Sequence, residues 1–231
     1  MEKGICYGVS VGPGDPELLT IKAINQIKSS DIIFLPSYPK EDCRVYKIIK
    51  AALPEISEEK YRCINTKGMA DPKTQDERYE ILAKEVAGIL DSGKTVAFPA
   101  LGEVCLYSTY FYVHTRLVKM GYDCRLISGI SSVQASFDKL LISMAQGDEQ
   151  VHIFPDTKDL NSRLSMNGTK IFMKPKGNLE ETIANIRKYS ENHPDLRAYG
   201  ISNYGNENEI IAGSIDELEK LSGYMTVIIV I

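Results

Sequence analysis

The sequence predicts an α/β fold made of two domains, and three observations predict it. Apolar strands alternate with amphipathic helices through the first half of the 231-residue chain. Three of those strands run into glycine-containing turns that lead into helices. The second half joins short strands by turns rich in glycine and asparagine, which favours a mixed sheet. Because ligands collect outside the carboxyl ends of strands in open α/β sheets, these turns are the first candidates for a binding site.

Composition narrows the classes of function. The net charge of −4 gives nucleic-acid binding no electrostatic support. The five cysteines form no C-x-x-C pair, which fits a reducing cytoplasm. We expect no signal peptide, because the N-terminal apolar run is short and broken by glycine and proline. We expect no membrane segment, because the apolar run at 226–231 is too short to span a bilayer and is typical of a buried strand. The isolated histidines lack metal-ligand spacing, so we expect no protein-bound metal.

The first strand ends in a rigid turn at 12–14. Glycine reaches φ values closed to other residues and lets backbone approach a ligand, and Pro13 stiffens the turn. Asp15 then stands at a helix N-cap position with Pro16 after it. The four-residue spacing predicts a helix whose buried stripe consists of Leu19, Ala23 and Ile27.

Hydrophobic patterning gives the next elements in order. Capping-box spacing at 74–77 begins a helix that Gly93 ends. A continuous apolar run at 95–98 is typical of a strand in a parallel sheet covered on both faces. The other elements expected here are a strand at 31–35, a helix through Ile48 and Ala52, an extended segment at 62–66 and a loop at 67–73.

Two further strand exits resemble the first. The strand at 95–98 leads into a turn at 101–108, and the strand at 125–127 leads into a turn at 128–132. Gly121 ends the helix between them. That helix is expected to carry Leu106, Tyr110, Val113, Leu117 and Met120 on one face, and the helix after the third turn Val133, Phe137 and Leu141.

The second half begins with strands at 151–155 and 169–173. A helix at 179–189 follows, then strands at 198–202 and 210–212, a short helix after Ser214 and a closing strand at 225–231. We place the domain boundary between residues 120 and 121, which gives domains 1–120 and 121–231 with a cleft between them.

Three motifs together resemble one family. The opening stretch 8–20, with Gly12-Pro13-Gly14-Asp15-Pro16, resembles the first motif of the tetrapyrrole (corrin/porphyrin) methyltransferases. The stretch 101–110 is similar to their second loop, usually G-D-P-x-L-Y-S, and 128–132 is similar to their third, usually P-G-I-T-S. The segment 146–149 favours the branch that methylates C20 of precorrin-2 or cobalt-precorrin-2. In this sequence Glu103 stands where the family usually has Asp, Val104-Cys105 replaces its usual proline pair, and Ser128 replaces proline.

The resemblance implies S-adenosylmethionine (SAM) as methyl donor, a tetrapyrrole substrate, a cytoplasmic location and a homodimer. It implies cofactor contacts from three turns and two later loops. The residues concerned are Pro13, Gly102, Glu103, Leu106, Ser131, Ser132, Met173, Asn203 and Tyr204. Some of these residues have an alternative interpretation. One of the two serines, Ser131 or Ser132, can cap its own helix, and Met173 can belong to the core.

Two residues are candidates for catalysis. Glu103 is a candidate base, with a solvated carboxylate or one at a helix N-terminus as the alternative. Tyr107 can hydrogen-bond the substrate or pack with a polar tip. The substrate carries many carboxylates, and the basic residues expected to bind them are Lys40, Arg44, Lys174 and Lys176.

Other functions stay open at this point. A relative acting on another ring position, or on a protein or RNA, shares the motifs, and so does a protein that binds SAM or a tetrapyrrole without catalysis. A plain dinucleotide-binding module is disfavoured, because Glu17 stands where the fingerprint needs its third glycine.

Overall fold

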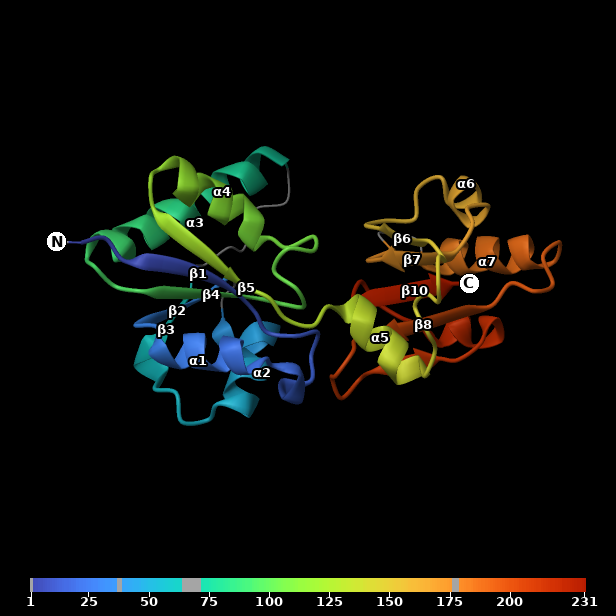
Figure 1. The fold of residues 1–231 in the computed structure, drawn as a ribbon, viewed down its shortest axis with the longest axis horizontal. Helices are drawn as coiled ribbons and strands as arrows, with labels where there is room; N and C mark the ends of the chain where they lie inside the picture. The colour runs from blue at the N-terminus through green and yellow to red at the C-terminus, as the bar shows by residue number, and fades with distance from the viewer. Residues whose placement is uncertain (1, 37–38, 64–71, 176–178) are drawn as a thin grey trace. The chain divides into compact units, whose positions relative to one another are not determined.

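The computed structural model describes residues 2–36, 39–63, 72–175 and 179–231. The chain divides into two compact units, Met1–Ser131 and Ser132–Ile231, each built on one five-stranded sheet (Figure 1). The expected boundary at residue 120 falls before the last strand of the first sheet, and that strand pairs with the first strand of the chain.

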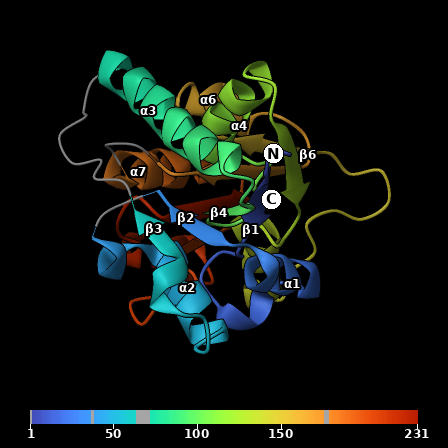
Figure 2. The same ribbon diagram turned by 90° about the vertical axis from the view of Figure 1, so that its left-hand side faces the viewer.

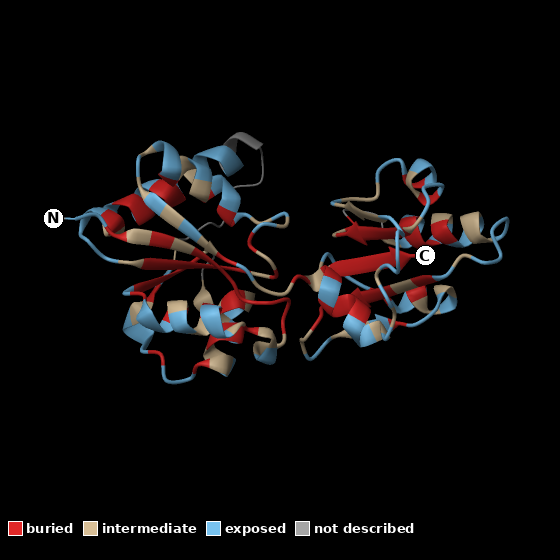
Figure 3. Ribbon diagram, in the orientation of Figure 1, coloured by how far each residue is buried: buried red, intermediate tan, exposed pale blue. Residues whose placement is uncertain are grey.

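The first unit contains a parallel sheet with the strand order β3-β2-β4-β1-β5. Strands β2 and β4 are buried along their whole length, as a sheet covered on both faces requires (Figure 3). The strands are β1 (Ile5–Ser10), β2 (Ile32–Leu35), β3 (Tyr61–Cys63), β4 (Val96–Ala100) and β5 (Asp123–Ile127).

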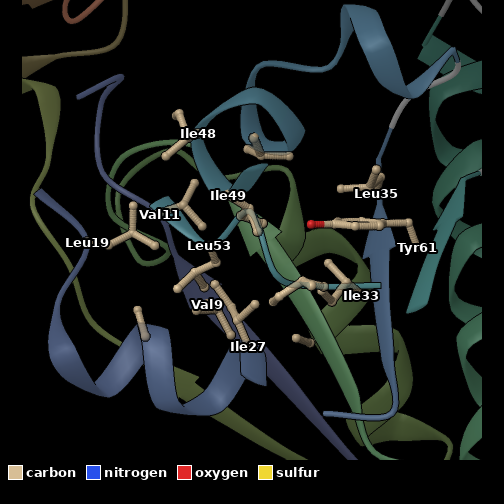
Figure 4. Close-up of a cluster of buried hydrophobic side chains, with 14 of the residues drawn as sticks. Val9, Val11, Leu19, Ile27, Ile33, Leu35, Ile48, Ile49, Leu53 and Tyr61 are labelled. Atoms are coloured by element: carbon tan, nitrogen blue, oxygen red, sulfur yellow. The ribbon is translucent and has the colours of Figure 1, made fainter. Parts of the chain in front are cut away.

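Two helices pack on each face of this sheet (Figures 1 and 2). Helices α1 (Ile21–Ser29) and α2 (Arg44–Ala52) cover one face, and α3 (Pro72–Asp91) and α4 (Tyr110–Lys119) cover the other. Figure 4 shows the core under α1 and α2, where Ile27 and Ile49 meet the strand residues Val9 and Ile33. Burying one such side chain fully contributes about 1.5–3 kcal/mol.

Helix α1 begins later than the sequence indicated. A single 3₁₀ turn follows Asp15, whose side chain accepts a hydrogen bond from the Glu17 amide at 2.9 Å. Leu19 is then extended, and Thr20 provides a new N-cap by accepting from the Ala23 amide at 3.1 Å. The buried stripe is confirmed, but Leu19 contributes to it from outside the helix.

Helix α4 also begins late, and α5 (Ser132–Leu140) ends early. Tyr107 has a φ of 49°, which a right-handed helix cannot contain, so Leu106 lies in the loop before α4. Leu141 has a φ of 53° and is 92% exposed, so its expected place on the buried face of α5 was wrong. Gly93 and Gly121 end their helices at φ values of 78° and 82°, as expected.

The second unit contains the expected mixed sheet, in the order β6-β7-β10-β8-β9. Strands β6 and β7 are parallel, and the other neighbours are antiparallel. Helix α5 contacts β8 and β10, while α6 (Leu160–Leu164) and α7 (Leu179–Ser190) share a core with Phe172 and Ile228. The strands are β6 (Val151–Phe154), β7 (Thr169–Met173), β8 (Ala198–Ser202), β9 (Ile210–Ala212) and β10 (Thr226–Val230).

Two smaller observations complete the fold. Helix α6 had no counterpart in the expected elements, and the expected short helix after Ser214 is a 3₁₀ helix at Ile215–Lys220. Within the described ranges, none of the helices combines the length and the apolar character that a bilayer crossing requires.

Candidate functional site

The first sheet has a topological switch point between β1 and β4. Strand β1 leads to α1 on one face, and its neighbour β4 leads to α4 on the other. The connections therefore diverge at the carboxyl ends of these two strands, which is where open α/β sheets bind ligands. Gly12 and Gly102 meet there, and the Gly102 amide donates to the Gly12 carbonyl at 2.7 Å.

The residues around this switch point form the first strand-end cluster. Gly12 and Gly102 have φ values of 76° and 73°, a region that favours glycine. Pro13 is buried and Leu106 is half-buried. Tyr107 is 45% exposed, and its left-handed backbone is the kind of strain that concentrates at functional sites. We define the cluster as Gly12, Pro13, Gly102, Glu103, Leu106 and Tyr107.

Glu103 uses its carboxylate to join separate loops. Its Oε2 accepts from the Gly129 amide at 2.6 Å and from the Ser10 hydroxyl at 3.2 Å. Its Oε1 accepts from the Cys105 amide at 3.1 Å. The side chain therefore links the carboxyl ends of β1, β4 and β5, an arrangement that neither sequence-based interpretation of Glu103 had included.

Ser10 is a residue that the sequence interpretation missed. It is the last residue of β1 and 1% exposed, and its Oγ accepts from the Val104 amide at 2.8 Å while donating to Glu103. The one signal available in the sequence was a hydroxyl at the end of an otherwise apolar strand. Ser131 is buried in the turn after β5, and Ser132 is the first residue of α5.

The second unit gathers four predicted residues, which we call the second strand-end cluster: Met173, Lys174, Asn203 and Tyr204. Strands β7 and β8 both run antiparallel to β10, which lies between them. Their carboxyl ends therefore meet at the amino end of β10. The Lys174 amide donates to the Thr226 carbonyl at 2.9 Å, and the Asn203 amide donates to the Met225 carbonyl at 2.8 Å.

Backbone strain marks this cluster as well. Lys174 and Asn203 have φ values of 50° and 55°, although neither is glycine. Met173, Asn203 and Tyr204 are all buried. A left-handed conformation costs a non-glycine residue about 1–2 kcal/mol, so its presence directly after β7 and after β8, the two strands that flank β10, favours a functional reason.

The remaining basic residues have different surroundings. Lys40 forms an ion pair with Glu58 at 2.5 Å, and Lys50 pairs with the same carboxylate at 2.8 Å. Arg44 is the first residue of α2 and half-buried, and burial lowers the pKa of its guanidinium group. Lys176 lies outside the described residues.

His114 and the pocket beside Lys170 lie outside the two strand-end clusters. His114 packs against Tyr110 and Phe111, and burial lowers the pKa of its imidazole. In the part of the chain that the structure describes, no group of three or more His, Cys, Asp and Glu side chains is arranged to hold a metal ion. A pocket of about 490 Å³ lies beside Lys170 at the amino end of β7, opposite to the strand end that carries Met173.

Known proteins share both the sequence and the fold. The family model of the tetrapyrrole (corrin/porphyrin) methylases matches residues 6–219. The chain is 32% identical over 228 residues to the probable cobalt-precorrin-2 C(20)-methyltransferase of Methanocaldococcus jannaschii, covering 97% of this chain and 94% of that protein. It is 29% identical over 185 residues to the precorrin-2 C(20)-methyltransferase of a Sinorhizobium species, covering 76% of this chain and 75% of that protein.

A solved structure shows the same two-domain α/β fold. The uroporphyrin-III C-methyl transferase from Thermus thermophilus, complexed with S-adenyl homocysteine, superimposes with a TM-score of 0.66. The match covers 98% of this chain and 92% of that one at 14% sequence identity, so this likeness concerns the fold alone.

Proposed function

The chain belongs to the tetrapyrrole (corrin/porphyrin) methylases, and on that premise we propose that it is a SAM-dependent methyltransferase. The methyl group goes to C20 of precorrin-2 or of cobalt-precorrin-2, a step of cobalamin biosynthesis. The observation that carries the proposal is the 32% identity to a probable cobalt-precorrin-2 C(20)-methyltransferase across 97% of the chain. The proposal includes the metal-free acceptor because the chain is also similar to a precorrin-2 C(20)-methyltransferase.

Residues of each strand-end cluster are proposed to bind polar parts of SAM. The donor presents an adenine, a ribose, a methionine end and a sulfonium, which backbone amides and carbonyls can bind without strongly basic side chains. Gly12 and Gly102 carry no Cβ to keep a ligand away from the turn, and the bond between the Gly102 amide and the Gly12 carbonyl fixes the two turns to each other. In the second cluster Met173 is proposed to pack on the adenine, and Asn203 and Tyr204 to contact the donor through their loop. Ser131 and Ser132 supply hydroxyls from the turn after β5 and the start of α5.

The protein's part in catalysis is orientation and exclusion of water. SAM supplies a methyl group that is already electrophilic, and C20 is a bridging carbon made electron-rich by its neighbouring nitrogens. Methyl transfer then needs an in-line approach, and holding that geometry lowers the barrier by several kcal/mol. Tyr107, which is 45% exposed beside the switch point, is proposed to hydrogen-bond the acceptor.

Basic side chains are proposed to bind the acceptor's carboxylates. Lys174 follows β7 in the second cluster, and Arg44 begins α2. Arginine binds a carboxylate in a bidentate manner, so Arg44 is the stronger candidate. Lys40 would have to exchange its bond to Glu58 for one to the substrate, and Lys176 completes the expected set.

The proposal includes a cytoplasmic location and a homodimer. All five cysteines are free, which fits a reducing compartment. The homodimer rests on the resemblance alone, and light scattering of the purified protein measures it directly.

A transfer assay tests the proposed function. The protein is incubated with SAM and either precorrin-2 or cobalt-precorrin-2, and the acceptor's mass is recorded over time. A gain of one methyl group on either acceptor supports the proposal. No gain on either, with uroporphyrinogen III methylated instead, would indicate a relative acting on another tetrapyrrole. Binding of S-adenosylhomocysteine without any transfer would indicate a binding protein.

A further inference from the structure

Ser10 and Gly129 lie far from Glu103 in the chain, and both donate a hydrogen bond to its carboxylate. Ser10 ends β1, Glu103 follows β4 and Gly129 follows β5. The Glu103 carboxylate accepts from Gly129 N at 2.6 Å and from Ser10 Oγ at 3.2 Å, and Ser10 Oγ accepts from Val104 N at 2.8 Å. Three strand exits are thus joined by two side chains.

These groups are closely packed. Ser10 is 1% exposed, so its hydroxyl has no exchange with bulk water, and it serves once as donor and once as acceptor. A Cβ added to Gly129 would lie 2.5 Å from the Ser10 Cβ, closer than carbon atoms approach. The turn after β5 therefore lies against the end of β1, and Glu103 bonds to the backbone at that contact.

We propose that Ser10 and Glu103 form a loop clamp that positions the three strand exits for SAM, and that neither of them transfers a proton in the reaction. The inference rests on the proposed function. Ser10 and Glu103 are positioning residues in this account, because they act through the backbone of the loops rather than on the acceptor.

The surroundings of the Glu103 carboxylate disfavour a role as base. Oε2 faces an N–H and a hydroxyl, and Oε1 faces the N–H of Cys105. Both lone pairs of Oε2 already accept hydrogen bonds, from the Gly129 amide and the Ser10 hydroxyl, so taking a proton from the acceptor at this oxygen would break one of them. Each lost bond leaves a polar group without its partner beside the switch point.

The length of the side chain is the second part of the inference. Aspartate in this position can keep the local bond to the Cys105 amide, because Asp side chains commonly bond the backbone two residues on. It is one methylene shorter, so it loses the bonds to Gly129 and Ser10. Glutamine keeps the full reach and one acceptor oxygen. If Glu103 acts as a clamp, Glu103→Gln should therefore impair the protein less than Glu103→Asp. If Glu103 acts as a base, Glu103→Asp should impair it less than Glu103→Gln.

The test compares Glu103→Gln, Glu103→Asp and Ser10→Ala with the wild-type protein. Ser30→Ala is the control, because Ser30 is fully buried in the same unit but sits at the amino end of β2, away from the strand exits. Calorimetry gives the Kd for S-adenosylhomocysteine, and the transfer assay gives kcat and KM as functions of pH. Thermal unfolding checks that every variant is folded.

The clamp predicts that affinity for S-adenosylhomocysteine falls about fivefold in Glu103→Gln, as expected for one lost hydrogen bond. In Ser10→Ala it falls about tenfold, because the bonds of the hydroxyl to Glu103 and to the Val104 amide are both lost. The loss in Glu103→Asp is about twentyfold or more, because two bonds go, both to an ionised acceptor. The pH profile of kcat keeps its shape in all variants, and Ser30→Ala binds like the wild type.

Two outcomes would overturn the clamp while leaving the proposed function intact. One is wild-type affinity in both Ser10→Ala and Glu103→Asp. The other is a hundredfold fall of kcat in Glu103→Gln at unchanged affinity, with one limb of the pH profile lost, which is the behaviour of a general base. Absence of binding and of transfer in the wild type would instead refute the proposed function.

Discussion

Two glycines with similar backbone angles allow the effect of a substitution on stability to be distinguished from its effect on ligand binding. Gly102 has a φ of 73° in the first cluster, and Gly121 has a φ of 82° at the end of α4, where an added Cβ meets no atom within 4 Å. An alanine at either position adopts a left-handed conformation that costs about 1–2 kcal/mol.

We therefore predict that Gly102→Ala and Gly121→Ala lower the free energy of unfolding by similar amounts. Only Gly102→Ala weakens S-adenosylhomocysteine binding, by about tenfold, the equivalent of ~1.4 kcal/mol. Denaturant unfolding and calorimetry measure the two quantities. Equal affinities in the two variants would remove Gly102 from the site.

A surface carboxylate gives a pH-dependent prediction. Hydrogen bonds from Lys40 and then Lys50 lower the pKa of Glu58 to about 2. Because the folded-state pKa lies below the unfolded value, the stabilisation is present at neutral pH and disappears as the pH falls from about 4.5 towards 2. The group is exposed, so the effect is small.

The variant Glu58→Gln should be less stable than the wild type at about pH 6 and equal to it near pH 2. Thermal unfolding at several pH values measures the convergence. Glu59→Gln, on the same turn, is the control and should show no such convergence. A constant difference across the whole pH range would show that the ion pair does not stabilise the fold.

At the level of residues, the sequence identified the turns that carry the candidate site residues, but not their hydrogen-bond partners. Gly12 and Gly102 could be predicted as turn residues, because glycine is typical of turns. The partners of Glu103 are not readable, since Ser10 and Gly129 lie 93 and 26 residues away. Their proximity follows from the strand order of the first sheet, which no local pattern specifies.

Among the elements, β1 and α3 give opposite expectations for the same substitution. A Cβ at Gly8 would lie 2.1 Å from the ring of Tyr110, which is 1% exposed and cannot move aside. A Cβ at Gly88, on the exposed side of α3, meets no atom within 4 Å. One glycine is required by packing, and the other only weakens a helix.

We predict that Gly8→Ala destabilises the protein by about 2–3 kcal/mol through overpacking. Gly88→Ala should stabilise it by about 0.5–1 kcal/mol, because alanine favours the helix interior over glycine. Chemical denaturation measures both changes. Destabilisation by Gly88→Ala would show that α3 is not a regular helix at that point.

The elements themselves were largely predictable, and the errors have local causes. Strands β2, β4 and β10 follow from continuous apolar runs. The starts of α1 and α4 were misplaced because Thr20 provides a second cap and because Tyr107 takes a left-handed φ. Helix α6 has five residues, too few for a helical period to show in the sequence.

At the scale of the whole chain, the sequence distinguished two kinds of sheet. The alternation of strands and helices in the first half, with the continuous apolar run at 95–98, indicated a parallel sheet covered on both faces. The short strands of the second half indicated a mixed one. Both predictions are confirmed. The carboxyl ends of parallel strands carry the glycine turns, so the same pattern located the candidate site.

The central claim is that this chain methylates C20. The most direct measurement uses SAM labelled with carbon-13 in its methyl group, with precorrin-2 and cobalt-precorrin-2 as acceptors, and locates the label in the purified product by NMR. We predict a single labelled methyl group, bonded to C20. A label on any other ring carbon, or binding of SAM with no label in either acceptor, would contradict the account.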